Sequence, residues 1–375
     1  IGGGQAGLAM SRCLLDRSID HVILERGRIG ERWRSERWDS LRLLTPNWQN
    51  RLPGWKYRGS DPNGYMTMPE IIDYLEKYAQ SFKAPVEEKT TVLAVEPCDS
   101  GYRVTTDRGT WLAENVVIAT GYCDVPHVPE AGKSLSDRIL SLAPTEYRNP
   151  NELPNKGVLI VGASATGIQL ADEIHASGRP VTLAVGRHTR MPRYYRGRDI
   201  LWWLDALGIL DQTPDDVFDF EISRRQPSLQ LVGRPDHSTL DLPALQGKGV
   251  QLVGRFIDVE KGSRVLFDDD LIAHTVAADV KLAQLLQRID EYVDQTELTR
   301  DVGAPESVTP FLWPAPAPTE IDLRAANIGT VLWATGFRRS YPWLKVPVLD
   351  TKGEVLHRGG VTPAPGLYVI GMQFM

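Results

Sequence analysis

The spacing of apolar residues predicts a turn, a helix and a strand at the start of the chain. Residues 2–7 are rich in glycine, residues 8–15 place apolar side chains at helical spacing, and residues 21–25 read His-Val-Ile-Leu-Glu. A short continuous apolar run of this kind is typical of a buried strand. The order is the opening of a βαβ unit. Because Gly2 directly follows Ile1, we expect the printed chain to begin inside a strand.

A second copy of this pattern lies in the middle of the chain. Residues 157–161 form a short apolar strand and residues 162–167 form the turn Gly-Ala-Ser-Ala-Thr-Gly. The helical pattern continues over residues 168–176, and residues 180–185 form the next strand. Duplication of this kind is stronger evidence for nucleotide binding than either turn alone.

Further strand-like runs fall on both sides of the second copy. Two of them end in the same tripeptide, Ala-Thr-Gly, at residues 119–121 and 334–336. A long helical pattern covers residues 273–298, and residues 366–371 return as a strand. This order predicts an α/β fold with two Rossmann-like dinucleotide-binding domains, one of them discontinuous because it is built from both ends of the chain.

Composition narrows the class of protein. The 375 residues include 42 lysines and arginines and 48 aspartates and glutamates, and the net charge of −6 disfavours general attraction to nucleic acid. No run of eighteen apolar residues is present, so we expect no transmembrane segment. Cys13, Cys98 and Cys123 lack the C-x-x-C spacing of a redox dithiol or a zinc knuckle. So few cysteines fit a reducing cytoplasm, and we expect a cytoplasmic protein without a metal site.

The first glycine turn has the spacing of a dinucleotide-binding site. Gly2 would allow the sharp bend, Gly4 would let the backbone approach a pyrophosphate, and Gly7 would let the helix pack on the strand. Glu25 stands at the end of the next strand, where an acidic residue binds the adenosine ribose. A purely structural turn is the alternative for the glycines alone, and the placement of Glu25 favours nucleotide binding.

The second turn differs from the first because no acidic residue stands at the end of the strand that follows it. Ser164 takes the place of the middle glycine, and the following strand ends at a basic run instead of a carboxylate. An arginine fork at this point suits the 2′-phosphate of NADPH. A solvated basic loop and a nucleic-acid patch are the alternatives, and the position of the run favours NADPH. The run comprises Arg187, His188, Arg190, Arg193, Arg196 and Arg198.

Four tryptophans and five arginines are concentrated between Arg32 and Trp55. Side chains of this kind can enclose a flat conjugated ring, or they can be core tryptophans with stacked guanidinium groups. Elsewhere the sequence offers no recognisable catalytic acid or base, no H-E-x-x-H and no nucleophile elbow. A bound cofactor that carries the chemistry would explain this lack.

Taken together, the two turns and the two Ala-Thr-Gly runs resemble the class B flavin-dependent monooxygenases. Within them, residues 37–46, Arg-Trp-Asp-Ser-Leu-Arg-Leu-Leu-Thr-Pro, resemble the CzcO-like bacterial branch. The resemblance covers essentially the whole chain and implies the FAD/NAD(P)-binding fold. It implies an FAD-binding domain at 1–150 and 325–375, an NADPH-binding domain at 151–324, and a flavin C4a-hydroperoxide as the oxidant.

The resemblance also suggests roles for individual residues. The family's G-G-x-W segment beside FAD matches residues 30–33, with Glu31 in place of the second glycine and Trp33 as a cofactor contact. The family's asparagine beside the flavin ring matches Asn47, with Asn50 as the alternative. The fingerprint histidine of Baeyer–Villiger enzymes is replaced by Ala143, which argues against that activity in particular.

The predicted function is NADPH-dependent monooxygenation of a small organic substrate with molecular oxygen. The alternatives are an NADPH oxidase or flavin reductase of the same fold, and a nucleotide-sensing regulator of a membrane transporter. The region of Trp202 and Trp203 and the long helix are read either as a homodimer face or as a buried core. Asn47 is the predicted catalytic residue. The predicted cofactor contacts are Gly2, Gly4, Gln5, Ala6, Gly7, Glu25, Arg26, Arg32, Trp33, Thr45, Val92, Thr120, Gly121, Gly162, Ser164, Ala165, Thr166, Arg187, His188, Arg190, Thr335 and Gly336.

Overall fold

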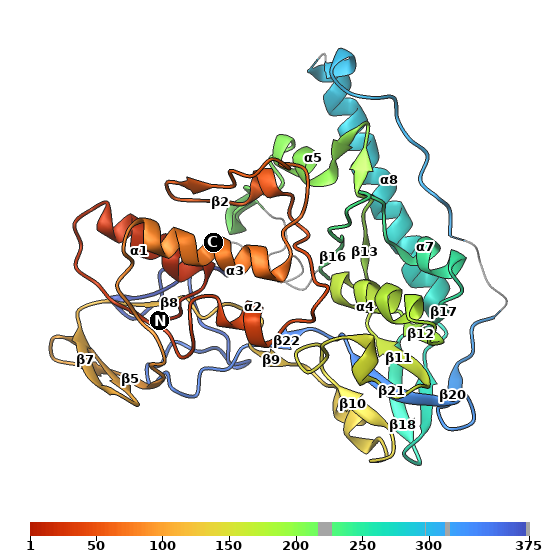
Figure 1. The fold of residues 1–375 in the computed structure, drawn as a ribbon, viewed down its shortest axis with the longest axis horizontal. Helices are drawn as coiled ribbons and strands as arrows, with labels where there is room; N and C mark the ends of the chain where they lie inside the picture. The colour runs from red at the N-terminus through yellow and green to blue at the C-terminus, as the bar shows by residue number, and fades with distance from the viewer. Residues whose placement is uncertain (217–226, 297, 312–315, 373–375) are drawn as a thin grey trace. The chain divides into compact units, whose positions relative to one another are not determined.

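The computed structural model describes residues 1–216, 227–296, 298–311 and 316–372 (Figure 1). The chain divides into two compact units, which are described separately. Unit 1 comprises Ile1–Arg37, Pro46–Pro126 and Phe337–Met375, and unit 2 comprises Trp38–Thr45 and His127–Gly336.

Unit 1 is built around short parallel strands. Strand β1 (Ile23–Leu24) pairs with β4 (Val86–Glu87), and β8 (Val116–Ile118) pairs with β23 (Leu367–Val369). Ile1 and Gly2 lie between the two pairs, because the Ile1 amine donates to the Val117 carbonyl and the Gly2 N–H donates to the Leu24 carbonyl. The strand order is therefore β23, β8, residues 1–2, β1, β4.

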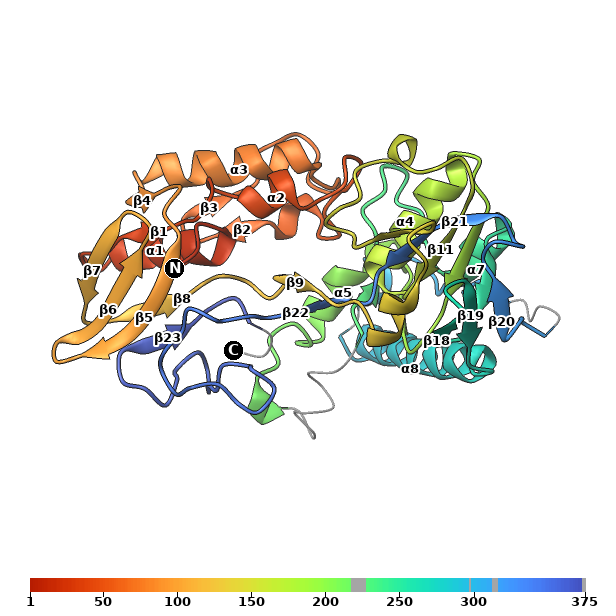
Figure 2. The ribbon, with the colours of Figure 1, turned by 90° about the horizontal axis from the view of Figure 1, so that it is seen from below.

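An antiparallel meander connects β4 to β8 in unit 1. It consists of β5 (Val92–Cys98), β6 (Gly101–Thr106) and β7 (Gly109–Ala113), which lie side by side in Figure 2. Two short antiparallel pairs complete the strands: β2 (Arg51–Leu52) with β3 (Trp55–Lys56), and β9 (Val125–Pro126) with β22 (Phe337–Arg338).

The helices of unit 1 have clear sequence signals. The turn of residues 2–7 leads into α1 (Gln5–Leu15). Helix α3 (Met68–Ser81) begins at a capping box, in which the Glu70 carboxylate accepts from the backbone N–H of Thr67 at 2.8 Å. Its apolar face is buried, and it contacts both α1 and α2 (Glu31–Ser35).

Unit 2 contains a five-stranded parallel sheet. Its order is β10 (Leu140–Leu142), β21 (Ile328–Trp333), β11 (Gly157–Val161), β12 (Val181–Ala184) and β17 (Gln251–Val253). β11 and β12 are buried at every position, as expected for strands covered on both faces. Helix α4 (Ala165–Ala176) packs on β11 and β12, and α7 (Leu242–Gly247) precedes β17 (Figure 1).

The two units repeat one topology. In unit 2 the meander is β18 (Phe256–Glu260), β19 (Arg264–Phe267) and β20 (Glu320–Asp322), and it leads into β21 as the first meander leads into β8. The units differ in two ways: the edge strand comes last along the chain in unit 1 (β23) and first in unit 2 (β10), and the last two strands of each meander are connected differently. β6 and β7 are joined by a tight turn, whereas residues 268–319 separate β19 from β20. The duplication inferred from the two glycine turns therefore extends to the strand order.

The inserted segment carries α8 (Leu271–Gln295), drawn in cyan in Figure 1. One face of α8 packs against α5 (Ile200–Ala206) in a separate apolar cluster, in which Trp203 is fully buried. The buried-core reading of this region therefore holds for Trp203, and no homodimer is shown. Four short strands and the 3-10 helices complete the described elements. They are β13 (Thr189–Arg190), β14 (Tyr194–Tyr195), β15 (Arg198–Asp199), β16 (Leu229–Gln230), η1 (Asn47–Gln49), η2 (Glu130–Ser134), η3 (Pro150–Glu152), η4 (Pro214–Asp216) and η5 (Leu298–Arg300).

The observed boundaries between the units differ from the predicted ones at residues 150 and 325. Residues 127–150 lie in unit 2 because β10 is an edge strand of its sheet, and residues 325–336 lie there because β21 is an inner strand. Trp38–Thr45 also belongs to unit 2. None of the described helices combines the length and apolar character that a bilayer crossing requires.

Candidate functional site

The three glycines that give the first turn its dinucleotide-binding spacing differ in their surroundings. Gly2 has φ +109°, and a Cβ there would lie 2.6 Å from the Ala119 carbonyl oxygen. A Cβ at Gly7 would lie 1.9 Å from the Gly2 carbonyl oxygen, so both positions exclude a side chain. At Gly4 a Cβ would meet no atom within 4 Å. The turn is thus closed on the protein side and open at Gly4, where a phosphate group can approach the backbone.

Helix α1 presents free backbone donors at this opening. Its first intrahelical bond runs from the Leu8 N–H to the Gly4 carbonyl at 3.0 Å, so the N–H groups of Gln5, Ala6 and Gly7 have no partner within the helix. Gln5 is exposed and Ala6 is partly exposed. A helix of eleven residues with an open N-terminus stabilises negative charge there, which fits the pyrophosphate of a dinucleotide.

Glu25 lies at the end of β1, directly beside the turn. One carboxylate oxygen accepts from the Gly3 N–H at 2.6 Å, and the other accepts from the Gly27 N–H at 2.8 Å. A carboxylate has about four lone-pair sites, so two acceptor positions remain for ribose hydroxyls. The neighbouring Arg26 is exposed and pairs with Glu36 at 3.4 Å, an interaction of two surface side chains.

The first Ala-Thr-Gly run closes the turn from the opposite strand. The Ala119 carbonyl faces Gly2, and Gly121, with φ +73°, has open space at its Cβ position. Thr120 between them is partly exposed. Val92, the first residue of β5, is also partly exposed. The contact of Thr120, Gly121 and Val92 with a cofactor stays a prediction.

The arginines and tryptophans of residues 32–55 differ in whether their side chains are already bound within the protein. The Arg32 guanidinium hydrogen-bonds the Cys123 carbonyl and the Asp124 carboxylate, so much of its donor capacity is used within the protein. Trp33 is partly exposed, and the Arg37 guanidinium lies 5.6 Å from its ring centre. Trp33 is therefore partly accessible to a ring system, whereas the Arg32 guanidinium is largely occupied by contacts within unit 1.

Asn47 is buried in η1 with one side of its amide unused. Its Nδ2 donates to the Asp61 carbonyl at 2.9 Å, and its backbone N–H donates to the Gly64 carbonyl at 2.9 Å. Its Oδ1 has no hydrogen-bond partner within the part of the chain that the structure describes. A buried acceptor without a partner is unusual, and a bound cofactor is one way to satisfy it. Thr45, two residues earlier, belongs to unit 2.

The second turn repeats the geometry of the first. Gly162 has φ +105°, and a Cβ there would lie 2.4 Å from the Ala334 carbonyl oxygen. A Cβ at Gly167 would lie 1.8 Å from the Gly162 carbonyl oxygen. Ser164 takes the place of Gly4, with φ −81° and ψ −172° against −87° and −170°. A side chain at this position therefore requires no change in the backbone.

The N-terminus of α4 is likewise available. The first intrahelical bond joins the Ile168 N–H to the Ser164 carbonyl at 3.1 Å, and Ala165 and Thr166 in the first turn are partly exposed. In the second Ala-Thr-Gly run, the Thr335 hydroxyl donates to the His127 carbonyl. Gly336 has φ +88° and open space at its Cβ position.

The predicted arginine fork is wrong for most of its members. Arg190 pairs with Asp241 through Nη2 and with Asp279 through Nη1, at 2.8 Å each, and Nη2 also donates to the Thr309 carbonyl. These partners lie far along the chain, so the local sequence had no acidic residue to indicate them. Arg190 is buried by this network, and its guanidinium is not free to bind a 2′-phosphate.

Two further members of the run are also structural. Arg193 is 1% exposed and its guanidinium pairs with the Asp199 carboxylate through two nitrogens. Arg196 is buried and donates to the Gly303 carbonyl at 3.1 Å. Burial of charged groups without such partners would be costly, so these arginines stabilise the loop that carries them.

Arg187 remains the candidate for binding the 2′-phosphate. It is exposed at the end of β12 and forms no ion pair with any residue that the structure describes. His188 is buried, its Nδ1 lies 3.0 Å from the Gly186 carbonyl, and burial lowers its pKa below the usual range. The imidazole is therefore neutral at neutral pH, and Arg187 supplies the positive charge at this strand end.

Gln230 is a candidate that the sequence did not indicate. Its side-chain Nε2 donates to the carbonyl of Ala163, the second residue of the second turn, at 2.6 Å. The two residues are 67 positions apart, and the run Leu-Gln-Leu-Val around Gln230 carries no motif. Only the folded chain brings them together.

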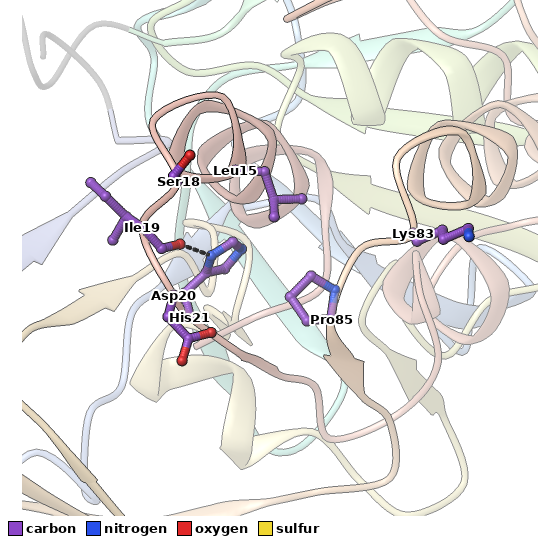
Figure 3. A pocket seen from close by; sticks show the side chains of 7 residues that line it. All are labelled: Leu15, Ser18, Ile19, Asp20, His21, Lys83 and Pro85. Atoms are coloured by element: carbon purple, nitrogen blue, oxygen red, sulfur yellow. Dashed lines mark hydrogen bonds between the residues drawn. The ribbon is translucent and has the colours of Figure 1, made fainter.

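A cavity of about 330 Å³ lies elsewhere in unit 1, between the C-terminal end of α1 and the start of β1 (Figure 3). Dinucleotides bind at the carboxyl ends of parallel strands, where the glycine turns are, whereas this cavity lies at the amino end of β1. It is therefore not a cofactor site. Its lining residues are Leu15, Ser18, Ile19, Asp20, His21, Lys83 and Pro85.

Comparison with known proteins identifies the family. Residues 1–198, more than half of the chain, match the model of the family described as pyridine nucleotide-disulphide oxidoreductase. The chain belongs to this family. It is also 33% identical over 381 residues to the CzcO-like oxidoreductase of Geobacillus kaustophilus, with coverage of 100% of this chain and 90% of the relative. These findings confirm the resemblance to the CzcO-like branch and the assignment as an oxidoreductase that uses FAD and NADPH.

Monooxygenases are among the relatives. The chain is 30% identical over 373 residues to indole-3-pyruvate monooxygenase YUCCA6 of Arabidopsis thaliana, with coverage of 94% of this chain and 79% of the relative. The solved structure of the flavin-containing monooxygenase from Stenotrophomonas maltophilia matches with a TM-score of 0.63 at 20% identity, covering 99% of this chain and 88% of the other. The shared fold confirms Rossmann-like dinucleotide-binding domains, and the relatives support a flavoprotein monooxygenase.

The family description mentions disulphides, but the three cysteines of this chain form no disulfide in the structure. Cys13, Cys98 and Cys123 are all free and partly buried in the structure. Within the described residues, no group of three or more histidine, cysteine or acidic side chains could hold a metal ion.

Replacement of Arg187 by alanine is expected to weaken NADPH binding at least about tenfold while NADH binding changes by less than about twofold. A charge-assisted bond to phosphate contributes about 1.5–3 kcal/mol, and about 1.4 kcal/mol is tenfold in affinity. Dissociation constants for both cofactors measure the effect. Arg198→Ala, which removes an exposed arginine of the same loop, is the control. Equal loss for NADPH and NADH would make Arg187 structural.

Proposed function

We propose that this chain is an NADPH-dependent flavoprotein monooxygenase that acts on a small organic substrate with molecular oxygen. The observation that carries the proposal is the pair of turns with the same backbone geometry but different strand ends. Glu25 follows the first turn, and Arg187 follows the second. A carboxylate suits an unmodified adenosine ribose, and an arginine suits a 2′-phosphorylated one.

The first turn is assigned to FAD. In this assignment the N–H groups of Gln5 and Ala6 bind the pyrophosphate over the open position at Gly4, and Glu25 binds the ribose. Trp33 and Asn47, which follow in the same unit, are placed toward the flavin ring. The fit of Gly4 and the unsatisfied Oδ1 of Asn47 support this arrangement. Unit 1 is then the FAD-binding domain.

The second turn is assigned to NADPH. Ser164, Ala165 and Thr166 form the open N-terminus of α4, and Arg187 lies at the end of the next strand. Unit 2 is then the NADPH-binding domain. Arg190 has no part in this assignment, because its guanidinium is already bound by two carboxylates.

The flavin, when bound, supplies the oxygen chemistry, for which the resemblance implies a C4a-hydroperoxide. The chain's own residues bind, orient and shield. Exclusion of water matters because water promotes loss of the oxidant as hydrogen peroxide. A buried amide such as Asn47, held by its contact with the Asp61 carbonyl, can orient groups near the ring without moving. The names of the monooxygenase relatives support oxygenation of small organic molecules. The proposal does not depend on the identity of the substrate.

Product analysis with isotope-labelled dioxygen tests the proposal. Full-length enzyme with FAD, NADPH and a panel of amines, thioethers and carbonyl compounds should place one labelled oxygen atom in an organic product. If all of the NADPH consumed is recovered as hydrogen peroxide with every compound, the chain is an oxidase. If NADPH is not consumed at all, a role in nucleotide sensing replaces enzymatic turnover.

Asn47→Ala is expected to shorten the lifetime of the oxygenated flavin about five- to tenfold. One hydrogen bond contributes about 1–1.5 kcal/mol. Its loss would speed the decay of the oxygenated flavin by about this factor. Stopped-flow mixing of NADPH-reduced enzyme with oxygen measures the lifetime. The matched control is Asn50→Ala in the same loop, whose Nδ2 donates to the Pro46 carbonyl at 3.3 Å. A larger effect of Asn50→Ala would transfer the role to Asn50.

A further inference from the structure

Gln230 connects a distant part of unit 2 to the second glycine turn. It is the last residue of β16, which pairs in parallel with β13, so that Gln230 lies opposite Arg190. Arg190 is held by Asp241 and Asp279. The backbone at Gln230 is therefore fixed by the same buried network that removes Arg190 from phosphate binding.

The side chain of Gln230 reaches the turn itself. It is 1% exposed, and its Nε2 donates to the Ala163 carbonyl at 2.6 Å. Only Nε2 can make this bond, because a carbonyl oxygen is an acceptor. The planar amide therefore places Oε1 beside the same turn, and this oxygen has no partner among the residues that the structure describes.

The unpaired Oε1 offsets what the bond to Ala163 contributes to the stability of the fold. A buried acceptor left without a donor costs at least as much as one neutral hydrogen bond contributes. An apolar side chain of similar size would avoid that cost, although it would take the donor from the buried Ala163 carbonyl. A glutamine that makes one bond and leaves one atom unsatisfied therefore calls for a reason other than stability.

The first turn shows what that reason is. Ala163 corresponds to Gly3, and the Gly3 N–H is held by the Glu25 carboxylate at 2.6 Å. The second turn has no acidic residue at the matching strand end, which reads Val185-Gly186-Arg187. Its second residue is instead held through the carbonyl, by Gln230. Each turn is thus fixed at the same residue by a side chain from outside the turn.

We propose that Gln230 is a positioning residue for the second dinucleotide. Its amide holds the Ala163 carbonyl in place, so that the turn keeps its N–H groups toward the pyrophosphate and a carbonyl dipole away from it. A carbonyl oxygen that turned toward the phosphates would repel them, and the amide donor prevents this rotation. The inference rests on the proposed binding of NADPH to unit 2.

Two variants test this role in the full-length, FAD-loaded protein. Gln230→Leu removes both polar atoms, and Gln230→Glu replaces the donor by an acceptor that faces the Ala163 carbonyl. The ligands are NADP⁺ and adenosine 2′-monophosphate, which carries the 2′-phosphate but neither phosphate of the pyrophosphate. The matched control is Gln251→Leu, because Gln251 bonds Thr182 in the same unit away from the turn.

We expect the affinity for NADP⁺ to fall at least about tenfold in Gln230→Leu and further in Gln230→Glu. Binding of adenosine 2′-monophosphate should stay within about twofold of wild type, and Gln251→Leu should bind both ligands normally. The KM for NADPH should rise, while the rate of flavin reduction at saturating NADPH stays within about twofold.

Two results would overturn the inference. An unchanged NADP⁺ affinity in both variants would leave the amide without a role at the turn, and an equal loss for both ligands would mean that unit 2 as a whole is damaged. Wild-type protein that binds no NADP⁺ would instead refute the proposed function. The two failures are therefore separate.

Discussion

Replacement of Gly4 by alanine is expected to give a folded protein that has lost most of its FAD. Gly4 has φ −87° and ψ −170°, which alanine adopts without strain, and the new methyl group meets no protein atom within 4 Å. The methyl group instead enters the space assigned to the pyrophosphate. Overpacking of this kind costs about 1–3 kcal/mol, or about 5- to 150-fold in affinity. Flavin absorbance per protein, with circular dichroism as the measure of folding, tests the result.

Two other glycines provide matched comparisons for Gly4→Ala. Gly7→Ala puts a methyl group 1.9 Å from the Gly2 carbonyl oxygen, so it should destabilise the fold itself by about 3 kcal/mol or more. Gly247→Ala adds a methyl group in open space at the end of α7 and should change neither folding nor FAD content. Normal flavin content in Gly4→Ala would remove the pyrophosphate from this turn.

Loss of the Arg193 guanidinium is expected to be among the most destabilising changes in unit 2. Its bonds join three parts of the chain: Asp199 at the start of α5, the Leu44 carbonyl at 2.8 Å and the Val232 carbonyl at 3.4 Å. Arg193→Leu leaves the Asp199 carboxylate buried without a cation, which costs about 3–5 kcal/mol. For a unit of this size we expect the melting temperature to fall by roughly 6–20 °C.

A variant of Asp199, the partner of Arg193, measures how much of the cost of Arg193→Leu comes from the unpaired charge. Asp199→Asn keeps an oxygen that can cap α5 through the Leu201 N–H but removes the negative charge. The double variant Arg193→Leu with Asp199→Asn should therefore be more stable than Arg193→Leu alone. Arg198→Ala, on the exposed part of the same loop, should change the melting temperature little. A double variant no more stable than the single one would mean that Arg193 acts through packing.

The connection between the units was not predictable from local patterns. Trp38–Thr45 looked like part of one continuous N-terminal domain, but its contacts lie in unit 2. The Ser40 hydroxyl donates to the Glu173 carboxylate, whose other oxygen accepts from the Tyr147 hydroxyl at 3.0 Å, and the Leu44 carbonyl accepts from Arg193. The bonds of Ser40 and Leu44 join residues more than a hundred positions apart, and nothing in the run itself indicates them.

The sequence by itself determined the two turns, because their geometry is local. A glycine with positive φ, a glycine in contact with a carbonyl five residues earlier, and a strand that ends in an acidic or a basic residue are all properties of short segments. The observed surroundings of Gly2, Gly7, Gly162 and Gly167 agree with this reading. The family resemblance could be read from the same segments, since they carry the chemistry of cofactor binding.

Only the tertiary structure decided which charged and polar side chains are free. The basic run after β12 appeared as one phosphate site because its first acidic residue, Asp199, comes only at its end. In the fold Asp241 and Asp279 neutralise Arg190, and Asp199 neutralises Arg193. Gln230 came to light for the same reason, through its bond to Ala163. A charge or an amide is available to a ligand only if no buried partner holds it, and such partners are brought together by the packing of distant segments.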